Sequence, residues 1–105
     1  MVHQPPTGLG MDICADGRQV GSPTVLKFIQ NNQPLLGCSG HIHESPYQPG
    51  GNWVARVGKT VWLQPGQVER KLHYVSLEIT ALFSVTNIRH SIFGPKALAA
   101  SGLVR

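Results

Sequence analysis

Apolar positions in this chain fall in short groups, and the first clear group predicts a helix. Ser22 is suited to cap the first helical turn, and Pro23 is tolerated at the next position because its missing N–H is not needed there. The apolar residues between positions 25 and 29 then share one helical face. Gln33-Pro34 ends the pattern, so we expect a helix over about residues 22–32.

The other apolar groups are shorter, and their composition and alternation predict strands. They cover residues 34–38, 53–57, 60–63, 71–80 and about 82–93. Gly58-Lys59 separates two of them by the spacing of a hairpin, and alternation places Val75, Leu77 and Ile79 on one face. One helix with mostly antiparallel strands predicts an α/β fold of the α+β type.

Glycine and proline mark the segments between these elements as loops. Pro5-Pro6 follows His3 and excludes a helix there, and a histidine before such a loop usually closes a strand. Residues 9–21 carry several glycines and few periodic apolar positions, so we expect a long ordered loop. Long loops in compact domains tend to be functional.

Composition limits the chain to one small domain. Its 105 residues are too few for two cores, and only 13% are charged, which suggests that part of its surface is meant to be covered. The formal charge of +4 arises from basic residues spread along the chain without a cluster, only Arg70 and Lys71 being adjacent, so no nucleic-acid-binding face is indicated.

The two cysteines, Cys14 and Cys38, have no Cys-x-x-Cys spacing, and residues 1–6 have no apolar core of a secretory leader. No apolar run reaches the roughly 20 residues of a membrane span. We therefore expect a soluble cytoplasmic protein with reduced thiols and no membrane partner.

The segment Gly37–Ser45 carries the candidate chemistry. His41 and His43 lie one residue apart after the apolar run, so both imidazoles can point to one volume if this segment is extended. Neutral imidazole is the commonest protein ligand of transition metals, although such a pair is also found simply solvated. Cys38 suggests an alternative zinc site with these histidines, against the reading of a buried inert thiol. Glu44 is a candidate hydrogen-bond acceptor that orients an imidazole ring, or a surface carboxylate.

Three segments in order, His3-Gln-Pro-Pro, Gly-His-Ile-His-Glu-Ser and Gln64-Pro65-Gly66, resemble the C-terminal half of the calcineurin-like metallophosphoesterases. The resemblance implies part of a β-sandwich flanked by helices, with residues 1–95 as a partial domain and 96–105 as a tail. It implies that His3 and His41 bind one metal ion and that His43 binds a second. Gln64 stands where the family has asparagine, which puts a role for that side chain in doubt.

The family activity is phosphoester hydrolysis at two divalent ions, which lower the pKa of a bridging water and clamp the phosphate. Histidine and carboxylate ligands suit Mn, Fe, Zn or Ni. The Asp-x-His, Gly-Asp-x-x-Asp and Gly-Asn-His motifs of the family's N-terminal half are not in this sequence. Three neutral imidazoles do not offset the repulsion between two such ions, so no complete catalytic set is expected in this chain alone.

A half sandwich would expose a sheet face and strand edges. We therefore expect a homo-oligomer, or a separately encoded N-terminal half as partner. Two other functions stay open: a non-catalytic module that binds one metal ion, and a purely structural oligomer. His73 and His90 lie in strand patterns and are expected to be structural or solvent-facing, and the large aromatic residues to be core or covered interface. The latter are Trp53, Trp62, Tyr74, Phe83 and Phe93.

Overall fold

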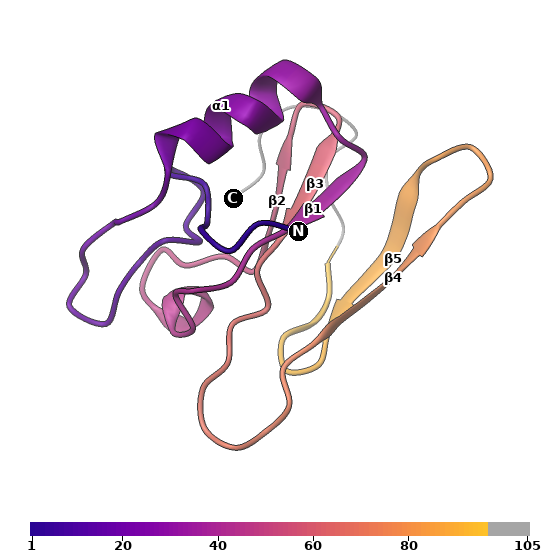
Figure 1. Cartoon of the computed structure of the whole chain (residues 1–105). Helices are drawn as coiled ribbons and strands as arrows, with labels where there is room; N and C mark the ends of the chain where they lie inside the picture. The colour runs from indigo at the N-terminus through magenta and orange to yellow at the C-terminus, as the bar shows by residue number, and fades with distance from the viewer. Residues whose placement is uncertain (97–105) are drawn as a thin grey trace.

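A computed structural model describes residues 1–96, which form two small sheets, an α-helix packed on the first of them and a short 3-10 helix (Figure 1). The elements are α1 (Pro23–Asn32), β1 (Leu36–Cys38), the 3-10 helix η1 (Ser45–Tyr47), β2 (Val54–Val57), β3 (Thr60–Leu63), β4 (Val75–Ile79), β5 (Val85–His90) and β6 (Gly94–Pro95). The α+β class expected from the sequence is confirmed. The short helix considered after residue 96 falls outside the described residues.

The helix α1 forms where the sequence predicts it and ends for the reasons given above. The Ser22 hydroxyl accepts a hydrogen bond from the backbone N–H of Val25 at 3.1 Å, which satisfies a free amide of the first turn. Gln33 closes the helix in a left-handed conformation, with φ 47°. Val25, Leu26 and the fully buried Ile29 then face the first sheet.

The first sheet has the strand order β1-β3-β2, with β1 parallel to β3 and β2 antiparallel to it. The predicted hairpin over 53–63 is confirmed as β2 and β3. Alternation divides the side chains of these strands between two clusters. Ala55, Val57 and Trp62 pack towards α1, whereas Val54 and Val61 pack towards the second sheet.

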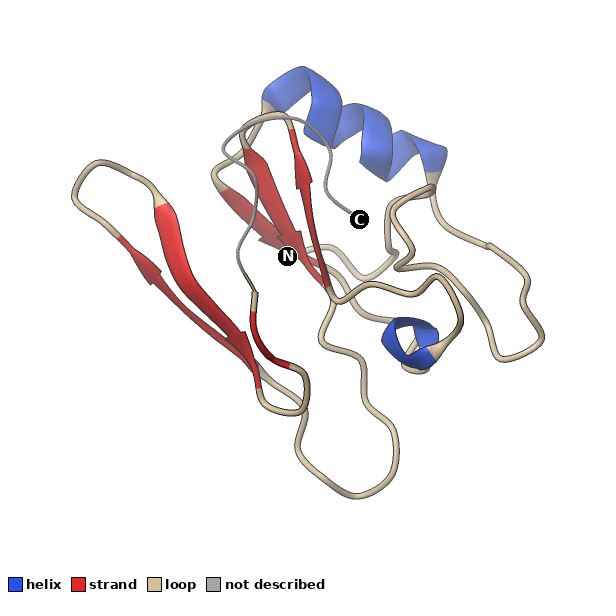
Figure 2. Ribbon diagram, turned by 180° about the vertical axis from the view of Figure 1, so that it is seen from behind, coloured by secondary structure: helices blue, strands red, loops and turns tan. Residues whose placement is uncertain are grey.

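The second sheet, β4-β5-β6, covers the other face of the first (Figure 2). Val75 and Leu77 point into the space between the sheets, as their alternation predicts, whereas Ile79, predicted on the same face, is 52% exposed. A register shift between Ser76 and Glu78 interrupts the pairing of β4 with β5. Both faces of the first sheet are therefore covered, and the exposed sheet face expected from the sequence is not found there.

The last predicted strand is shorter than residues 82–93, because turns occupy both of its ends. The Thr80 hydroxyl accepts hydrogen bonds from the amides of Leu82 and Ser84, which shapes a tight turn before β5. The hairpin also extends past the first sheet, so Phe83 is 76% exposed rather than part of the core. Tyr74 and Phe93 are similarly exposed, in contrast to the buried tryptophans.

The loop over residues 9–21 contributes to the core more than its glycine content suggests. Leu9, Met11 and Ile13 are all buried, and the first two belong to the cluster beneath α1. Asp12 is buried between them, with its Oδ2 atom accepting a hydrogen bond from the Gly21 amide. None of the helices in residues 1–96 combines the length and the apolar character that crossing a membrane requires.

Candidate functional site

The structure brings His3 and His41 into contact, although 38 positions separate them in the chain. The N-terminal segment runs beside the end of β1, where the Val2 amide donates to the Cys38 carbonyl and the Gly40 amide to the His3 carbonyl. These two bonds align the imidazoles. His3 Nε2 lies 2.8 Å from His41 Nδ1, and the ring planes meet at 63°. At this distance the two rings share a hydrogen bond, with the donor set by the ring tautomers.

His41 holds its position through an unusual backbone conformation. Its φ is 68°, and the Ile42 amide donates to the Gly40 carbonyl at 2.8 Å across it. A three-residue turn with positive φ is rare and strained. A residue other than glycine in such a conformation costs on the order of 1–3 kcal/mol, and such strain collects at functional sites.

A buried amide fixes the residue between the two histidines of the motif. Gln64 is fully buried; its Nε2 donates to the carbonyls of Ile42 and Met11, and its Oε1 accepts from the Ser39 hydroxyl at 2.8 Å. The indole N–H of Trp62 donates to that same hydroxyl. Gln64 thus joins the histidine segment to β3 and to the loop over residues 9–21, a role that its place in a proline-glycine turn did not suggest.

Two further polar residues join the motif to the same loop. The buried Ser45 hydroxyl accepts from the Ile13 amide and donates to the Gly10 carbonyl. The Glu44 carboxylate accepts from the Ala15 amide at 3.0 Å. Within residues 1–96, Glu44 has no hydrogen bond to an imidazole, so the structure gives it a loop contact instead of the ring-orienting contact considered from the sequence.

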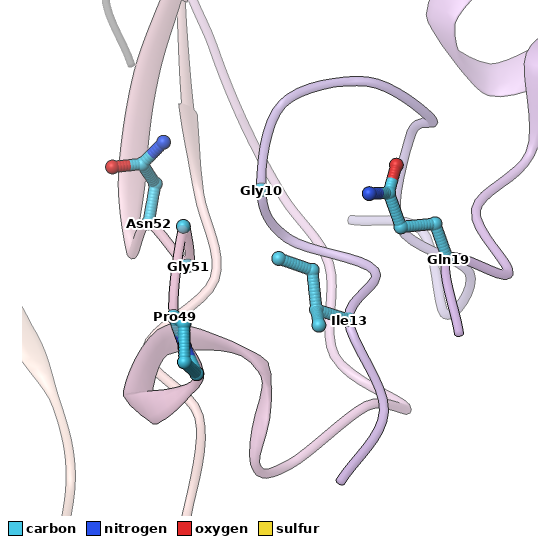
Figure 3. Close-up of a pocket in the computed structure, with 7 residues that line it drawn as sticks. Gly10, Ile13, Gln19, Pro49, Gly51 and Asn52 are labelled. Atoms are coloured by element: carbon cyan, nitrogen blue, oxygen red, sulfur yellow. The ribbon is translucent and has the colours of Figure 1, made fainter. Parts of the chain in front are cut away.

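Beyond Ser45, residues 49–52 and the long loop enclose a pocket of about 380 Å³ (Figure 3). Gly10, Ile13 and Gln19 line one side, and Asn52 lies on the other. The Asn52 backbone amide donates to the Gly10 carbonyl, which ties the two sides together. No ionisable side chain lines this pocket, so it offers no imidazole, thiolate or carboxylate ligand for a metal ion.

His43 is exposed, and its carbonyl accepts a hydrogen bond from the Gln67 amide at 2.9 Å. Because φ is positive at His41, the segment is not extended, and the i, i+2 alignment assumed for the two rings does not apply. Among residues 1–96, no three His, Cys, Asp or Glu side chains are grouped so as to hold a metal ion. Within these residues the structure therefore forms neither the zinc site with Cys38 nor a three-residue site with His43.

The pair of His3 and His41 fits two positions of a metal's coordination shell. Two imidazole nitrogens bound to one tetrahedral ion at about 2.05 Å lie about 3.3 Å apart. The observed 2.8 Å separation is about 0.5 Å shorter, and the nitrogens point at each other, so each ring would also have to turn by about 35° to direct its lone pair at a shared ion. Both side chains are exposed, and within residues 1–96 neither has another hydrogen bond that would prevent such a rotation. Binding would displace the proton that the rings share, because both nitrogens must present lone pairs.

Four of the five Asp and Glu side chains have hydrogen-bond partners away from the pair, and the fifth, Glu69, lines a separate cavity with Tyr47 and His73. The partners of the four are the Gly21 amide for Asp12, Arg18 for Asp16, the Ala15 amide for Glu44 and the Asn87 side chain for Glu78. Backbone and side-chain hydrogen bonds to Arg18 lower the pKa of Asp16, against an opposing effect of desolvation. The chain therefore presents imidazoles at this position without an accompanying acid.

A second group of rings supports the turn that carries Gln64. His90 is 1% exposed; its Nε2–H donates to the Pro65 carbonyl, and its Nδ1 accepts from the amides of Ile92 and Phe93. Desolvation lowers the pKa of His90, the hydrogen bond to Pro65 opposes this, and the charge of nearby His73 lowers it further. Of the two roles expected for His90, structural or solvent-facing, the structure shows the structural one.

Tyr47 completes this group through a hydrogen bond to Nδ1 of His73. Burial, with a smaller contribution from the negative charge of Glu69, raises the pKa of the Tyr47 hydroxyl. The tyrosine is therefore neutral near pH 7 and packs between His73 and Phe93 as a structural residue.

Comparison with models of protein families, with characterised proteins and with solved structures finds no match to this chain. Functional assignment consequently depends on the geometry of the histidine pair and on the chemistry of its surroundings.

Proposed function

We propose that this chain supplies the histidine side of a divalent-metal site for phosphoester hydrolysis, and that the acidic ligands come from another polypeptide. The observation that carries the proposal is the contact between His3 Nε2 and His41 Nδ1 at 2.8 Å. Neither residue is near the other in sequence, and each occupies the position of a metal ligand in the motifs that resemble metallophosphoesterases.

The strained turn supports this assignment. A neutral hydrogen bond between exposed groups contributes about 0.5–1.5 kcal/mol. Holding His41 in a left-handed turn costs about as much or more, so the ring contact alone does not account for the conformation. Coordination of a cation by both rings would give the strained geometry a function.

Each of the chain's residues has a limited part in this proposal. His3 and His41 offer neutral nitrogen ligands, and Gln64 fixes the backbone at Ile42 so that the second ring is held in place. A bound divalent ion would lower the pKa of its water and neutralise charge on a phosphate. The carboxylates needed to hold a second ion nearby would come from the partner polypeptide.

Calorimetric titration of the chain with Zn²⁺ and Mn²⁺ tests the first part of the proposal. We expect about one ion per chain, with proton release visible as a dependence of the heat on buffer ionisation enthalpy. His3→Ala and His41→Ala should each remove binding, whereas His43→Ala in the same loop should leave this first ion in place. Unchanged binding after either of the first two substitutions contradicts the proposal.

Hydrolysis of bis(4-nitrophenyl) phosphate with added Mn²⁺ tests the second part. We expect no more than background hydrolysis by the chain alone and turnover once the acidic half, expressed separately with the three missing motifs, is added. Turnover that is unaffected by His41→Ala in the reconstituted complex would refute the catalytic assignment.

A further inference from the structure

A groove lies between the turn of the β4–β5 hairpin and the first sheet, away from the histidines. Its volume is about 470 Å³, within the range of about 300–1,000 Å³ common for small-molecule sites. Beyond β4 and β5, the hairpin turn diverges from the first sheet in both views (Figures 1 and 2). The apolar side chains that line the groove are Leu35, Val61, Phe83 and Val85, and the cations are Arg56 and Lys59.

Arg56 is the only residue of β2 that is not buried, and it lies on the same strand face as Val54. Because Val54 packs towards the second sheet, Arg56 points into the space between the sheets at its open end. Its Nε atom is buried and has no hydrogen-bond partner among residues 1–96. A buried donor of a cation without an acceptor is costly, and a ligand that accepts from it removes this cost.

Two other polar residues line the groove, Gln33 and Ser84. The Gln33 side chain is already engaged, because its Oε1 accepts a hydrogen bond from the Lys59 backbone amide at 2.6 Å and its Nε2 donates to the Ile29 carbonyl. The side chains of Arg56 and Lys59 are therefore the cationic donors of the groove, the Ser84 hydroxyl is a neutral one, and no carboxylate is among the lining residues. The groove thus combines an apolar wall with uncompensated positive charge.

The turn of the hairpin presents an aromatic ring to this groove. Phe83 has φ 57°, a conformation that a bulky residue seldom adopts. The Phe83 amide donates to the Thr80 carbonyl, and the Thr80 amide donates to the Ser84 carbonyl, so two backbone hydrogen bonds fix the turn that carries the ring. Phe83 forms part of the groove wall although 76% of it is exposed, and a ligand would cover it.

From these contacts we propose that the groove binds an anionic amphiphile of the fatty-acid class. The ligand carboxylate accepts hydrogen bonds from Arg56, since the guanidinium fork matches the geometry of a carboxylate. It also forms an ion pair with Lys59. The alkyl chain lies against Val61, Val85 and Phe83. This site does not depend on the histidine pair or on the proposed hydrolytic function.

Nuclear magnetic resonance titration of the full chain with octanoate tests the proposal. Shifts are expected at Arg56, Val61 and Phe83, including the side-chain Nε–H of the arginine. Octanol carries the same chain without charge, and acetate carries the charge without the chain, so each should bind at least tenfold more weakly than octanoate. Binding of octanol as tight as that of octanoate would overturn the assignment of the anion to Arg56.

Three variants separate the contributions to binding. Arg56→Gln should weaken octanoate binding by about tenfold or more, as expected for loss of a charged hydrogen bond. Lys59→Gln and Phe83→Ala change exposed side chains, so they test the same groove if the first variant fails to fold. Arg70→Gln makes the same change at an exposed arginine that does not line the groove, so it is the matched control and should leave octanoate affinity unchanged.

Sedimentation separates this ligand from a second copy of the chain as the occupant. A monomer that binds octanoate in the groove supports the proposal. A dimer that Phe83→Ala dissociates, and that excludes octanoate, would overturn it, as would octanoate shifts confined to residues outside the groove.

Discussion

Replacement of His41 by glycine tests the link between its backbone conformation and its chemistry. The ring projects from a turn with φ 68°, which glycine adopts without steric cost. His41→Ala provides the reference, because alanine lacks the ring but keeps the Cβ that causes the strain. Comparing the two variants removes the contact with His3 from both sides of the comparison.

The expected difference follows from two opposing terms. Relief of the left-handed conformation is worth about 1–2 kcal/mol. Glycine also gives the unfolded chain more freedom, which costs about 0.4–1 kcal/mol. His41→Gly should therefore be more stable than His41→Ala by about 0.8 kcal/mol, within a range of about 0–1.6 kcal/mol, and the central value corresponds to about 3–6 °C in Tm for a domain of this size.

The same pair of substitutions at His43 supplies the control. His43 is exposed like His41, but its φ is not positive, so alanine should be the more stable residue there by about 0.4–1 kcal/mol. Urea unfolding and thermal melting followed by circular dichroism measure all four variants. A preference for alanine at position 41 as large as that at position 43 would refute the left-handed strain assigned to His41.

Three other substitutions test the supports of the site. Gln64→Ala leaves three buried partners unsatisfied and should lower the free energy of unfolding by about 3 kcal/mol or more. Gln30→Ala, on the exposed face of α1, is the control and should change it by no more than about 0.5 kcal/mol. Urea unfolding measures both variants. Burial lowers the pKa of His90 below its ordinary value of 6.5, so the stability contributed by the neutral ring is fully present above about pH 6.5 and is lost as the pH falls towards the folded-state pKa. His90→Leu should flatten this part of the profile of unfolding free energy against pH. An unchanged pH dependence would contradict the assignment. Gly37→Ala places a Cβ against the indole ring of Trp62 on the facing strand and should lower the free energy of unfolding by at least about 1–3 kcal/mol. Gly40→Ala places a Cβ that meets no atom within 4 Å and should leave it nearly unchanged. Similar melting temperatures for the two variants would be inconsistent with the packing of β1.

Local chemistry made the helix and the first hairpin predictable from sequence. Ser22 and Pro23 define a start that does not depend on the rest of the fold, and Gly58-Lys59 between two β-type runs defines a turn. The contact of His3 with His41 followed from the order of motifs and not from periodicity. Its formation depends on the N-terminal segment pairing beside β1, which a pattern of residues does not encode locally.

Polar residues that bridge distant loops could not be found in the same way. Gln64 lies in a turn whose composition predicts exposure, and it is buried only because the histidine segment and the long loop both close over it. Likewise, Phe83 belongs to a run of alternating apolar residues, which predicts a place in the core or in a covered interface. The hairpin is longer than the sheet it covers, so the ring extends beyond the core.

The energies at the histidine pair show which interaction controls the other. A shared hydrogen bond between the rings is worth about 0.5–1.5 kcal/mol, which does not exceed the cost of the strained turn at His41. The buried hydrogen bond from Gln64 to the Ile42 carbonyl acts on the next residue and leaves a costly unsatisfied group if it is broken. The side-chain amide of Gln64 therefore stabilises the turn at His41, and the turn positions the His41 ring. Loss of Gln64 should accordingly separate His3 from His41 and weaken metal binding even where the chain still folds, whereas loss of the His3 ring should leave the conformation of His41 unchanged.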